Sequence, residues 1–414
     1  MKPYARIASV IEVLSLRQNS KYPVDQILTR YLRERRFIGS KDRRYITEMI
    51  FRICRNQLHY NELIGQEKPS PRALALADLV IHQQHSPEEM FVKEPYAPTP
   101  LNKQEREVLE KLQQPAEVSE AAQYNLQPEI FEKLQTTYAD WSDLMQSLDQ
   151  DPTVDLRANT ARNSREEVAA KLKQQGLEAQ LTKYSKYGLK LAKRGNIKNT
   201  GSWKSGVIDV QDEAAQIAVS LCASLNPAMA LDYCAGAGGK SLALATIMGD
   251  RIKVTAFDVD RDRLDNLAPR QKRLKLRKIT TTPNISGKYD LVMADVPCSG
   301  SGTWRRNPDQ VWQLTAARLK EYSTLQQQIL QEATEFVKPG GHLAYMTCSI
   351  FPEENQNQLE EFLKCNNSFE LVNLEDLWKK SCCEKYPGEE NYLQLLPHKH
   401  NTDGFFVSIL KKTS

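Results

Sequence analysis

Two cysteines are the residues of this chain whose positions best suit covalent chemistry. Cys298 closely follows the apolar run YDLVMADV, and Cys348 directly follows GHLAYMT. Both runs are typical of strands in one open α/β sheet, where ligands lie beyond the carboxyl ends of the strands. We therefore expect the two thiols to face one pocket, although a free cysteine is often only a small buried hydrophobe.

A pair of thiols suits methyl transfer to carbon 5 of cytosine, a carbon too weakly nucleophilic to attack a sulfonium unaided. A thiolate that adds to carbon 6 makes carbon 5 enamine-like, and a base must afterwards remove the proton from carbon 5. A thiol whose pKa of about 8.5 is lowered by its surroundings suits that second step. Asp295 offers a carboxyl group that can hydrogen-bond to N3 of the ring or protonate it. Position alone does not tell which thiol attacks.

A glycine-rich turn, CAGAGGKS, follows an expected strand at MALDYC. Its glycines let the backbone turn tightly against a ligand. Asp258, 18 residues beyond Lys240, can accept hydrogen bonds from both hydroxyls of a ribose. Together these features predict an adenosine-bearing cofactor, and NAD, ATP and S-adenosylmethionine are the candidates. The glycine spacing departs from that of a phosphate-binding loop, which disfavours ATP.

The elements that must position these residues change type along the chain. Residues 1–145 are expected to form a small helical bundle, in which residues 100–126 are a polar connection before one helix at PEIFEKLQTTYADWSDLMQSL. Residues 146–205 resemble a β-α-β-β unit. From 206 to 414, strands and helices alternate, which indicates a parallel sheet covered on both faces. A terminal antiparallel hairpin would make that sheet mixed.

Composition sets broad limits on function. The chain has 56 Lys and Arg against 52 Asp and Glu, so its net charge of +4 is a weak hint of a polyanionic partner. No leader-like or membrane-length apolar run is present, and we expect neither export nor membrane insertion. The eight cysteines include no C-x-x-C pair, so we expect no metal, reduced thiols and a cytoplasmic location.

Basic residues gather in three segments that could contact RNA phosphates. They are RYLRERRFIGSKDRRYITEMIFRICR, the pair that follows the Cys298 loop, and RQKRLKLRK at 270–278. For each, a solvated surface or helix face is the alternative. The candidates for contact with RNA are Arg35, Arg36, Arg43, Arg44, Arg305 and Arg306.

Four motifs resemble those of the RNA cytosine-5 methyltransferases of the RsmB, Nop2 and Sun type. They are DVPCSGSGTWRRNPDQVW, YMTCSIFPEENQNQLEEFL, VQDEAAQ and LLPHKHNTDGFF, and the resemblance covers residues 150–414. The N-terminal bundle is similar to the NusB-like domain fused to bacterial members. The resemblance implies an α/β, Rossmann-like class I methyltransferase domain with a mixed sheet. It also implies an all-helical NusB-like RNA-binding domain and a small α+β RRM-like module before that domain.

The resemblance also implies roles for individual residues. Cys348 becomes the nucleophile and Cys298 the base that releases the product, with Asp295 and Lys240 beside them. A Pro-Cys motif in cytosine-5 DNA methyltransferases would order the thiols the other way round. S-adenosylmethionine is the implied cofactor. The residues implied around it are Cys234, Ala235, Gly236, Ala237, Gly238, Gly239, Lys240, Asp258 and Asp295.

Two departures from the family pattern stand out. The usual Cys-Ala-Ala-Pro-Gly-Gly-Lys turn is CAGAGGK here, which lacks the proline at Ala237. Family members often have an aspartate after the third strand that meets the adenine amine. The corresponding stretch, KLRKITTTPNISGKYD, offers only Thr, Asn and Ser before the next strand.

These observations predict S-adenosylmethionine-dependent methylation of carbon 5 of cytosine in RNA through a covalent cysteine adduct. The NusB-like bundle favours small-subunit, 16S-type ribosomal RNA, and we expect a monomer. The target base must be unpaired or extruded for a thiol to reach it. The alternatives are a catalytically silent RNA-binding assembly factor, a tRNA cytosine-5 methyltransferase and an NAD-dependent dehydrogenase.

Overall fold

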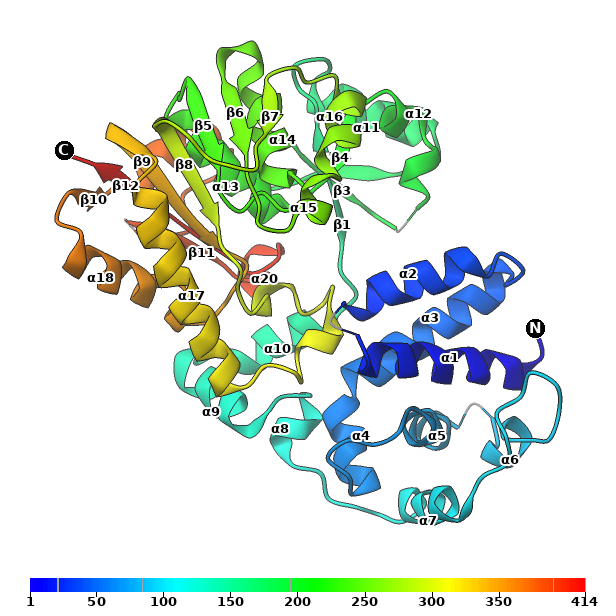
Figure 1. Ribbon diagram of the computed structural model, residues 1–414. Helices are drawn as coiled ribbons and strands as arrows, with labels where there is room; N and C mark the ends of the chain where they lie inside the picture. Colours follow the sequence, from blue (N-terminus) through cyan, green and yellow to red (C-terminus); the bar gives the residue numbers. More distant parts are fainter. Residues whose placement is uncertain (21, 84, 194, 390, 414) are drawn as a thin grey trace. The chain divides into compact units, whose positions relative to one another are not determined.

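The computed structural model describes residues 1–20, 22–83, 85–193, 195–389 and 391–413 (Figure 1). Two units can be distinguished along the chain. The first holds residues 1–150 together with 304–316, and the second holds 151–303 together with 317–414. In the part that the structure describes, no helix combines the length and apolar character needed to cross a membrane.

The first unit is helical, as the sequence predicts. Its helices pack around an apolar cluster in which Ile7, Ile46, Ile50, Ile53 and Leu76 are fully buried. The helices are α1 (Pro3–Gln18), α2 (Val24–Glu34), α3 (Ser40–Arg55), α4 (Gln57–Ile64), α5 (Pro71–His82), α6 (Pro87–Met90), α7 (Lys103–Leu112), α8 (Glu120–Gln123), α9 (Pro128–Thr137) and α10 (Trp141–Asp149).

Two details of this unit differ from the prediction. The expected connection at 100–126 contains α7, which begins at a capping box: Glu105 N–H donates to Asn102 Oδ1 at 2.9 Å and Asn102 N–H to Glu105 Oε2 at 3.0 Å. The expected single helix after it is two helices, because Tyr138 is extended and ends α9.

The first unit also includes the segment 304–316, which follows the Cys298 loop in sequence. Asp309 is buried there, and its Oδ2 accepts hydrogen bonds from Arg17 Nε at 2.8 Å and from the Val24 N–H at 3.1 Å. The segment is thus held by polar contacts to α1 and α2.

The second unit begins with a small α+β module. Its sheet has the order β2-β3-β1-β4 and is antiparallel throughout the described strands. The expected β-α-β-β unit is confirmed, and β4, just past the expected end at residue 205, adds a further strand. The elements are β1 (Val154–Ala158), α11 (Arg165–Gln174), β2 (Ala179–Leu181), β3 (Gly188–Leu191), α12 (Gly201–Lys204) and β4 (Ile208–Val210).

The main sheet has the order β10-β12-β9-β8-β5-β6-β7 among the described residues, with β11 paired to β12. Strands β5 to β9 are parallel and the terminal hairpin is antiparallel, so the predicted mixed sheet is confirmed. The strands are β5 (Met229–Asp232), β6 (Lys253–Ala256), β7 (Ile279–Thr281), β8 (Tyr289–Asp295), β9 (Val337–Thr347), β10 (Phe369–Leu371), β11 (Tyr392–Leu395) and β12 (Phe405–Lys412).

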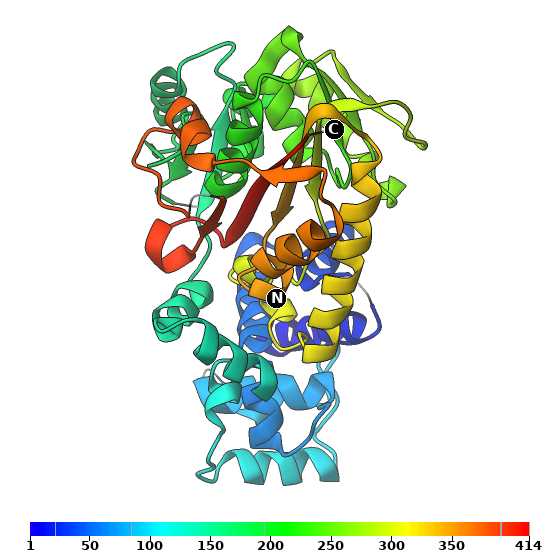
Figure 2. The same cartoon turned by 90° about the vertical axis from the view of Figure 1, so that its left-hand side faces the viewer.

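Helices cover both faces of this sheet because its central strands are apolar on both sides. Ala230 belongs to the apolar cluster on one face and Leu231 to the cluster on the other. Helices α17 and α18 lie side by side, joined by the hydrogen bond from Gln327 Nε2 to the Gln358 carbonyl at 3.0 Å (Figures 1 and 2). The helices are α13 (Glu213–Ser224), α14 (Gly239–Met248), α15 (Arg261–Leu264), α16 (Leu267–Leu274), α17 (Ala316–Thr334), α18 (Gln356–Cys365), α19 (Leu374–Ser381) and α20 (Pro397–His400).

Candidate active site

The two candidate thiols lie at the carboxyl ends of neighbouring strands. Strands β8 and β9 run parallel, with Asp295 opposite Met346, so that Cys298 and Cys348 leave the sheet at the same edge. Their sulfur atoms are 3.3 Å apart. The two thiols therefore share one position beyond the strand ends.

A buried carboxyl group ties the two cysteine loops together. Glu354 is fully buried, and its Oε2 accepts hydrogen bonds at 2.5 Å from the hydroxyls of both Ser299 and Ser349. Its Oε1 accepts from the Ser299 N–H at 2.8 Å and from Gln326 Nε2 at 3.0 Å. Because Ser299 follows Cys298 and Ser349 follows Cys348, this carboxyl group limits how far the thiols can separate. Burial raises the pKa of Glu354 above its ordinary value.

Further bonds cross between the same loops. The Ile350 N–H donates to Ser301 Oγ at 3.0 Å, and the Gly302 N–H donates to the Cys348 carbonyl at 2.9 Å. Within the segment that follows Cys348, Asn355 Nδ2 donates to the Ser349 carbonyl at 3.0 Å. Polar groups this deeply buried normally find partners, and here their partners fix the geometry of the thiols.

The thiol of Cys298 keeps its proton in the resting protein. Its hydrogen bond with Cys348, followed by burial, raises the pKa of Cys298 well above its ordinary value. The expectation that the surroundings lower the pKa of this thiol is therefore wrong for the free enzyme. The physical reason is that the hydrogen bond with Cys348 and burial both favour the neutral thiol, and repulsion between like charges adds a smaller contribution.

Lys240 links the cofactor turn to the thiols. Its Nζ donates to Asp295 Oδ2 and lies 5.1 Å from the centre of the Phe405 ring. Burial opposes its charge, but Asp295, together with Asp232 and Cys348, raises the pKa of Lys240 above its ordinary value. The ammonium group is therefore a fixed positive charge beside Asp295, and it interacts electrostatically with Cys348.

The glycine-rich turn joins β5 to α14. Asp232, the last residue of β5, is buried and its Oδ2 accepts from the Ser241 N–H at 3.0 Å and the Ser241 hydroxyl at 2.6 Å, which caps α14. Burial raises the pKa of Asp232 to about 6. Gly236 and Gly238 have φ values of +52° and +75°, a region that favours glycine. The loss of proline at Ala237 leaves this turn intact.

Asp258 lies against the turn, two residues beyond the end of β6. Its Oδ2 accepts from the Gly236 N–H at 2.6 Å and its Oδ1 from the Asp260 N–H at 2.8 Å. Each oxygen keeps a second lone pair that can accept a hydroxyl. At Gly239 an added Cβ would meet nothing within 4 Å, so the turn is open on that side. These features fit a nucleoside cofactor.

Comparison with known proteins identifies the family. A family model described as 16S rRNA methyltransferase RsmB/F matches residues 220–411, and the RsmF/B-like ferredoxin-like domain matches residues 130–198. The probable ribosomal RNA small subunit methyltransferase B of Synechocystis sp. is 34% identical over 71% of this chain and 68% of its own length. The ribosomal RNA small subunit methyltransferase B of Shewanella oneidensis is 32% identical over 72% and 69%.

The chain belongs to the RsmB/F family. The crystal structure of PH0851 agrees over 100% of this chain and 99% of that one, with a TM-score of 0.80 and 26% identity. The structure of NSun6 from Pyrococcus horikoshii with SFG shares the fold over 70% of this chain, with a TM-score of 0.61 and 16% identity. The predicted family, fold, RNA methyltransferase activity on ribosomal RNA and S-adenosylmethionine cofactor are thus confirmed.

Within this RsmB/F-family protein, the predicted RNA contacts of the helical unit differ in exposure. Arg35 donates to Glu12 at 2.6 Å, and Arg43 donates to the Ile38 carbonyl at 2.7 Å, so both guanidinium groups are engaged inside the unit. Arg36 is exposed, and Arg44 is exposed while paired with a neighbour on its own helix. The last two are the better placed to meet a phosphate.

The pair after the Cys298 loop is less accessible than expected. Arg305 is 5% exposed and Arg306 is half-buried. An arginine in a surface contact with RNA should present its guanidinium group to solvent, so Arg305 is the weaker candidate of the two.

Glu354, Asn355 and Asp232 are site residues that the sequence reasoning missed. Glu354 and Asn355 stand in FPEEN, inside a motif that resembles the family, and Asp232 ends the strand before the turn. For Asp232 the available signal was an acid at the end of an apolar strand, whereas Glu354 and Asn355 stand among other polar residues and carry no such local signal. In the described residues, no group of three His, Cys, Asp or Glu side chains could hold a metal ion.

The glycine-rich turn should not tolerate a side chain at Gly238. A Cβ there would lie 2.4 Å from Leu267 Cδ1 at a φ of +75°, whereas at Gly287, with a φ of +82°, it would meet nothing within 4 Å. Gly238→Ala should therefore lower the free energy of unfolding by about 2–5 kcal/mol, the sum of left-handed strain and overpacking, and Gly287→Ala by only about 1–2 kcal/mol. Urea denaturation of both variants measures the difference, and equal losses would contradict this account.

Proposed function

We propose that this enzyme methylates carbon 5 of a cytosine in 16S ribosomal RNA through a covalent cysteine adduct. The observation that carries the proposal is the 3.3 Å distance between the sulfurs of Cys298 and Cys348 at neighbouring strand ends. Methylation of an exocyclic amine needs no thiol, and a hydride transfer uses neither. Two thiols that share one space are what carbon 5 chemistry requires, one to attack and one to remove a proton.

The electrostatics of the pair support Cys348 as the nucleophile. A hydrogen bond to Cys348 and burial raise the pKa of Cys298, which makes Cys298 the poorer attacking group. The Lys240 ammonium group interacts electrostatically with Cys348. This assignment agrees with the roles implied by the family resemblance.

The reaction follows from these positions. The Cys348 thiolate adds to carbon 6, and the electron pair moves to carbon 5. The proton that N3 takes passes from Lys240 Nζ through the Asp295 carboxyl group, which accepts its hydrogen bond. S-adenosylmethionine, when bound, would supply the methyl group that carbon 5 takes and would leave as S-adenosylhomocysteine. Cys298, after its own proton has passed to solvent, removes the proton from carbon 5. The ring double bond re-forms as the bond between carbon 6 and sulfur breaks, which returns the Cys348 thiolate, and the N3 proton goes back through Asp295 to Lys240.

The raised pKa of Cys298 is compatible with its role as the base. Once Cys348 is bonded to the ring, its sulfur is a neutral thioether. The two interactions with Cys348 that raise the pKa of Cys298 are then changed, while burial continues to raise that pKa.

The proposed cofactor residues are those of the glycine-rich turn and Asp258, which lies against it. The backbone of residues 234–240 and the Asp258 carboxylate would hold the methionine part and the ribose. Val259, which is 90% exposed, follows Asp258 and offers an apolar surface to the adenine in place of the missing third-strand aspartate. A target cytosine in ribosomal RNA would place the enzyme in the cytoplasm, where ribosomes are assembled.

Nucleoside analysis tests the proposed product. The purified enzyme, incubated with 16S ribosomal RNA and S-adenosylmethionine labelled in the methyl group, should yield labelled 5-methylcytidine after digestion and mass spectrometry. Parallel reactions with tRNA and with the large-subunit RNA should yield less than about a tenth as much. A label on an exocyclic amine or a ribose would contradict the chemistry, and preference for tRNA would contradict the substrate.

A further inference from the structure

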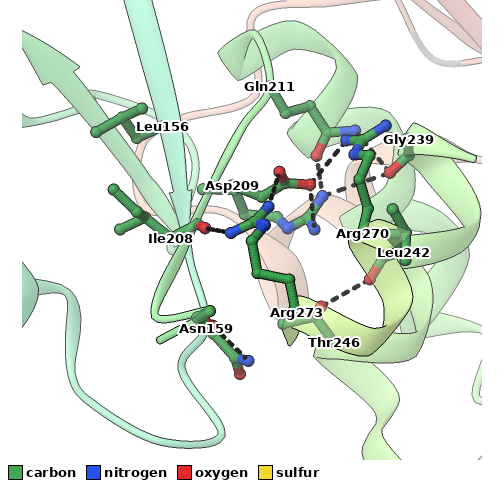
Figure 3. Close-up of polar contacts among 12 residues, drawn as sticks. Leu156, Asn159, Ile208, Asp209, Gln211, Gly239, Leu242, Thr246, Arg270 and Arg273 are labelled. Atoms are coloured by element: carbon green, nitrogen blue, oxygen red, sulfur yellow. Dashed lines mark hydrogen bonds and ion pairs between the residues drawn. The ribbon is translucent and has the colours of Figure 1, made fainter. Parts of the chain in front are cut away.

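A buried ion cluster stands behind the cofactor turn. Asp209, on β4, is 1% exposed and accepts from Arg270 Nη2 at 2.7 Å and from Arg273 Nη2 at 2.5 Å (Figure 3). Arg157, on β1, is also 1% exposed and lies 3.6 Å from the same carboxylate. Three guanidinium groups therefore converge on one carboxylate between the small module and α16.

Two of these three arginines reach the backbone of the glycine-rich turn. Arg270 Nη1 donates to the Ala237 carbonyl at 2.9 Å. Arg157 Nη1 donates to the Gly239 carbonyl at 3.4 Å and also to Gln211, whose Nε2 donates to that carbonyl at 3.3 Å (Figure 3). The two carbonyls flank Gly238, where the backbone is left-handed. The cluster thus holds both ends of the turn's tightest part.

This arrangement gives the run RQKRLKLRK a role that the sequence left open. Arg270 and Arg273 point inward to Asp209, whereas Lys272, Lys275, Arg277 and Lys278 are exposed. The inward pair has side-chain exposures of 25% and 13%. A polyanion at the surface would contact the exposed residues of the run. Arg270 and Arg273 instead donate their hydrogen bonds to groups of this chain.

We propose that Arg270, oriented by Asp209, is a positioning residue for the cofactor turn. The small α+β module, which carries Asp209, then anchors the cofactor site through the ion pair of Asp209 with Arg270. The proposal rests on the proposed function only in that residues 234–240 bind S-adenosylmethionine. Without the Arg270 bond, the Ala237 carbonyl is free to rotate. The N–H groups of the turn then lose the fixed directions that a bound ligand needs.

A merely stabilising ion cluster would behave differently. Loss of such a cluster lowers the melting temperature. In the protein that is still folded, the conformation of the turn and its affinity for a cofactor stay the same. A positioning role requires that affinity fall while the protein is still folded. Binding measured well below the melting temperature therefore separates the two.

The test compares Arg270→Met with Arg277→Met as a matched control. Calorimetric titration with S-adenosylhomocysteine should show a dissociation constant raised about 10-fold in Arg270→Met and unchanged within twofold in Arg277→Met. Hydrogen exchange of the free proteins should be faster over residues 234–240 in Arg270→Met alone. The KM for ribosomal RNA should not change. An affinity and exchange rate equal to those of the parent protein would overturn the proposal.

Two further variants keep the result interpretable. Asp209→Asn preserves the shape of its side chain and removes the charge that orients Arg270, so it should weaken binding by about 3- to 10-fold. Combined with Arg270→Met, it should add little, because both changes break one interaction. Additive losses would overturn the coupling. Failure of the parent protein to bind S-adenosylhomocysteine would instead contradict the proposed cofactor site.

Discussion

Replacement of Cys298 by alanine is expected to leave ribosomal RNA covalently attached to the protein, whereas replacement of Cys348 should abolish attachment. Without Cys298 the adduct forms and the methyl group is transferred, but no base removes the proton from carbon 5. Without Cys348 no bond to carbon 6 forms. Both variants should lose about 10³-fold or more in turnover, the scale seen when one member of a group that acts as a unit is removed.

Denaturing gels of each variant with labelled RNA and S-adenosylmethionine measure this difference. Cys298→Ala should give a shifted protein–RNA band that persists in denaturant, and Cys348→Ala should give none. Cys365→Ala, on the exposed part of α18, is the matched control and should turn over like the parent protein. A band from Cys348→Ala alone would reverse the roles of the thiols, and a band from neither would contradict the adduct.

Replacement of Glu354 by alanine is expected to slow adduct formation by about 100-fold or more, since a misplacement of about 1 Å at a reacting group can cost about that factor. The change removes four hydrogen bonds that hold the two cysteine loops. It also leaves the Ser299 N–H without its acceptor, at a cost of about 1–3 kcal/mol in stability. The rate of band formation in the Cys298→Ala background measures the effect.

Two variants show whether this effect is one of positioning. Glu354→Gln keeps an acceptor and presents an amide to hydroxyls that can reverse their direction, so it should recover part of the rate. Glu360→Gln, exposed on the following helix α18, should change nothing. Affinity for S-adenosylhomocysteine should be kept in Glu354→Ala, because this carboxyl group contacts the cysteine loops and not the turn. If Glu354→Ala lost the rate of adduct formation and the affinity for S-adenosylhomocysteine to the same extent, the result would indicate general unfolding instead.

Local pattern was sufficient for the strands that present the site. Alternation of apolar strands and helices after residue 206 placed β5, β6, β8 and β9 close to their observed bounds. It thereby put Cys298, Cys348 and Asp258 at strand ends. Burial of both sheet faces imposes that pattern on each strand separately, so it can be detected without knowing the neighbours. One exception is the start of β9, which lies at Val337 and so before the expected run GHLAYMT, because Val337 already pairs with Tyr289.

What the sequence by itself determined about this protein is its family, its order of elements and the types of the reacting groups. Only the tertiary structure decided that Glu354 joins the two cysteine loops, that contact with Cys348 raises the pKa of Cys298, and that Arg270 and Arg273 point inward. Each of these depends on a partner 50 or more residues away in the chain. The direction of a charged side chain and the pKa of a thiol are set by the groups that packing brings next to them, and no local period in the sequence records that neighbourhood.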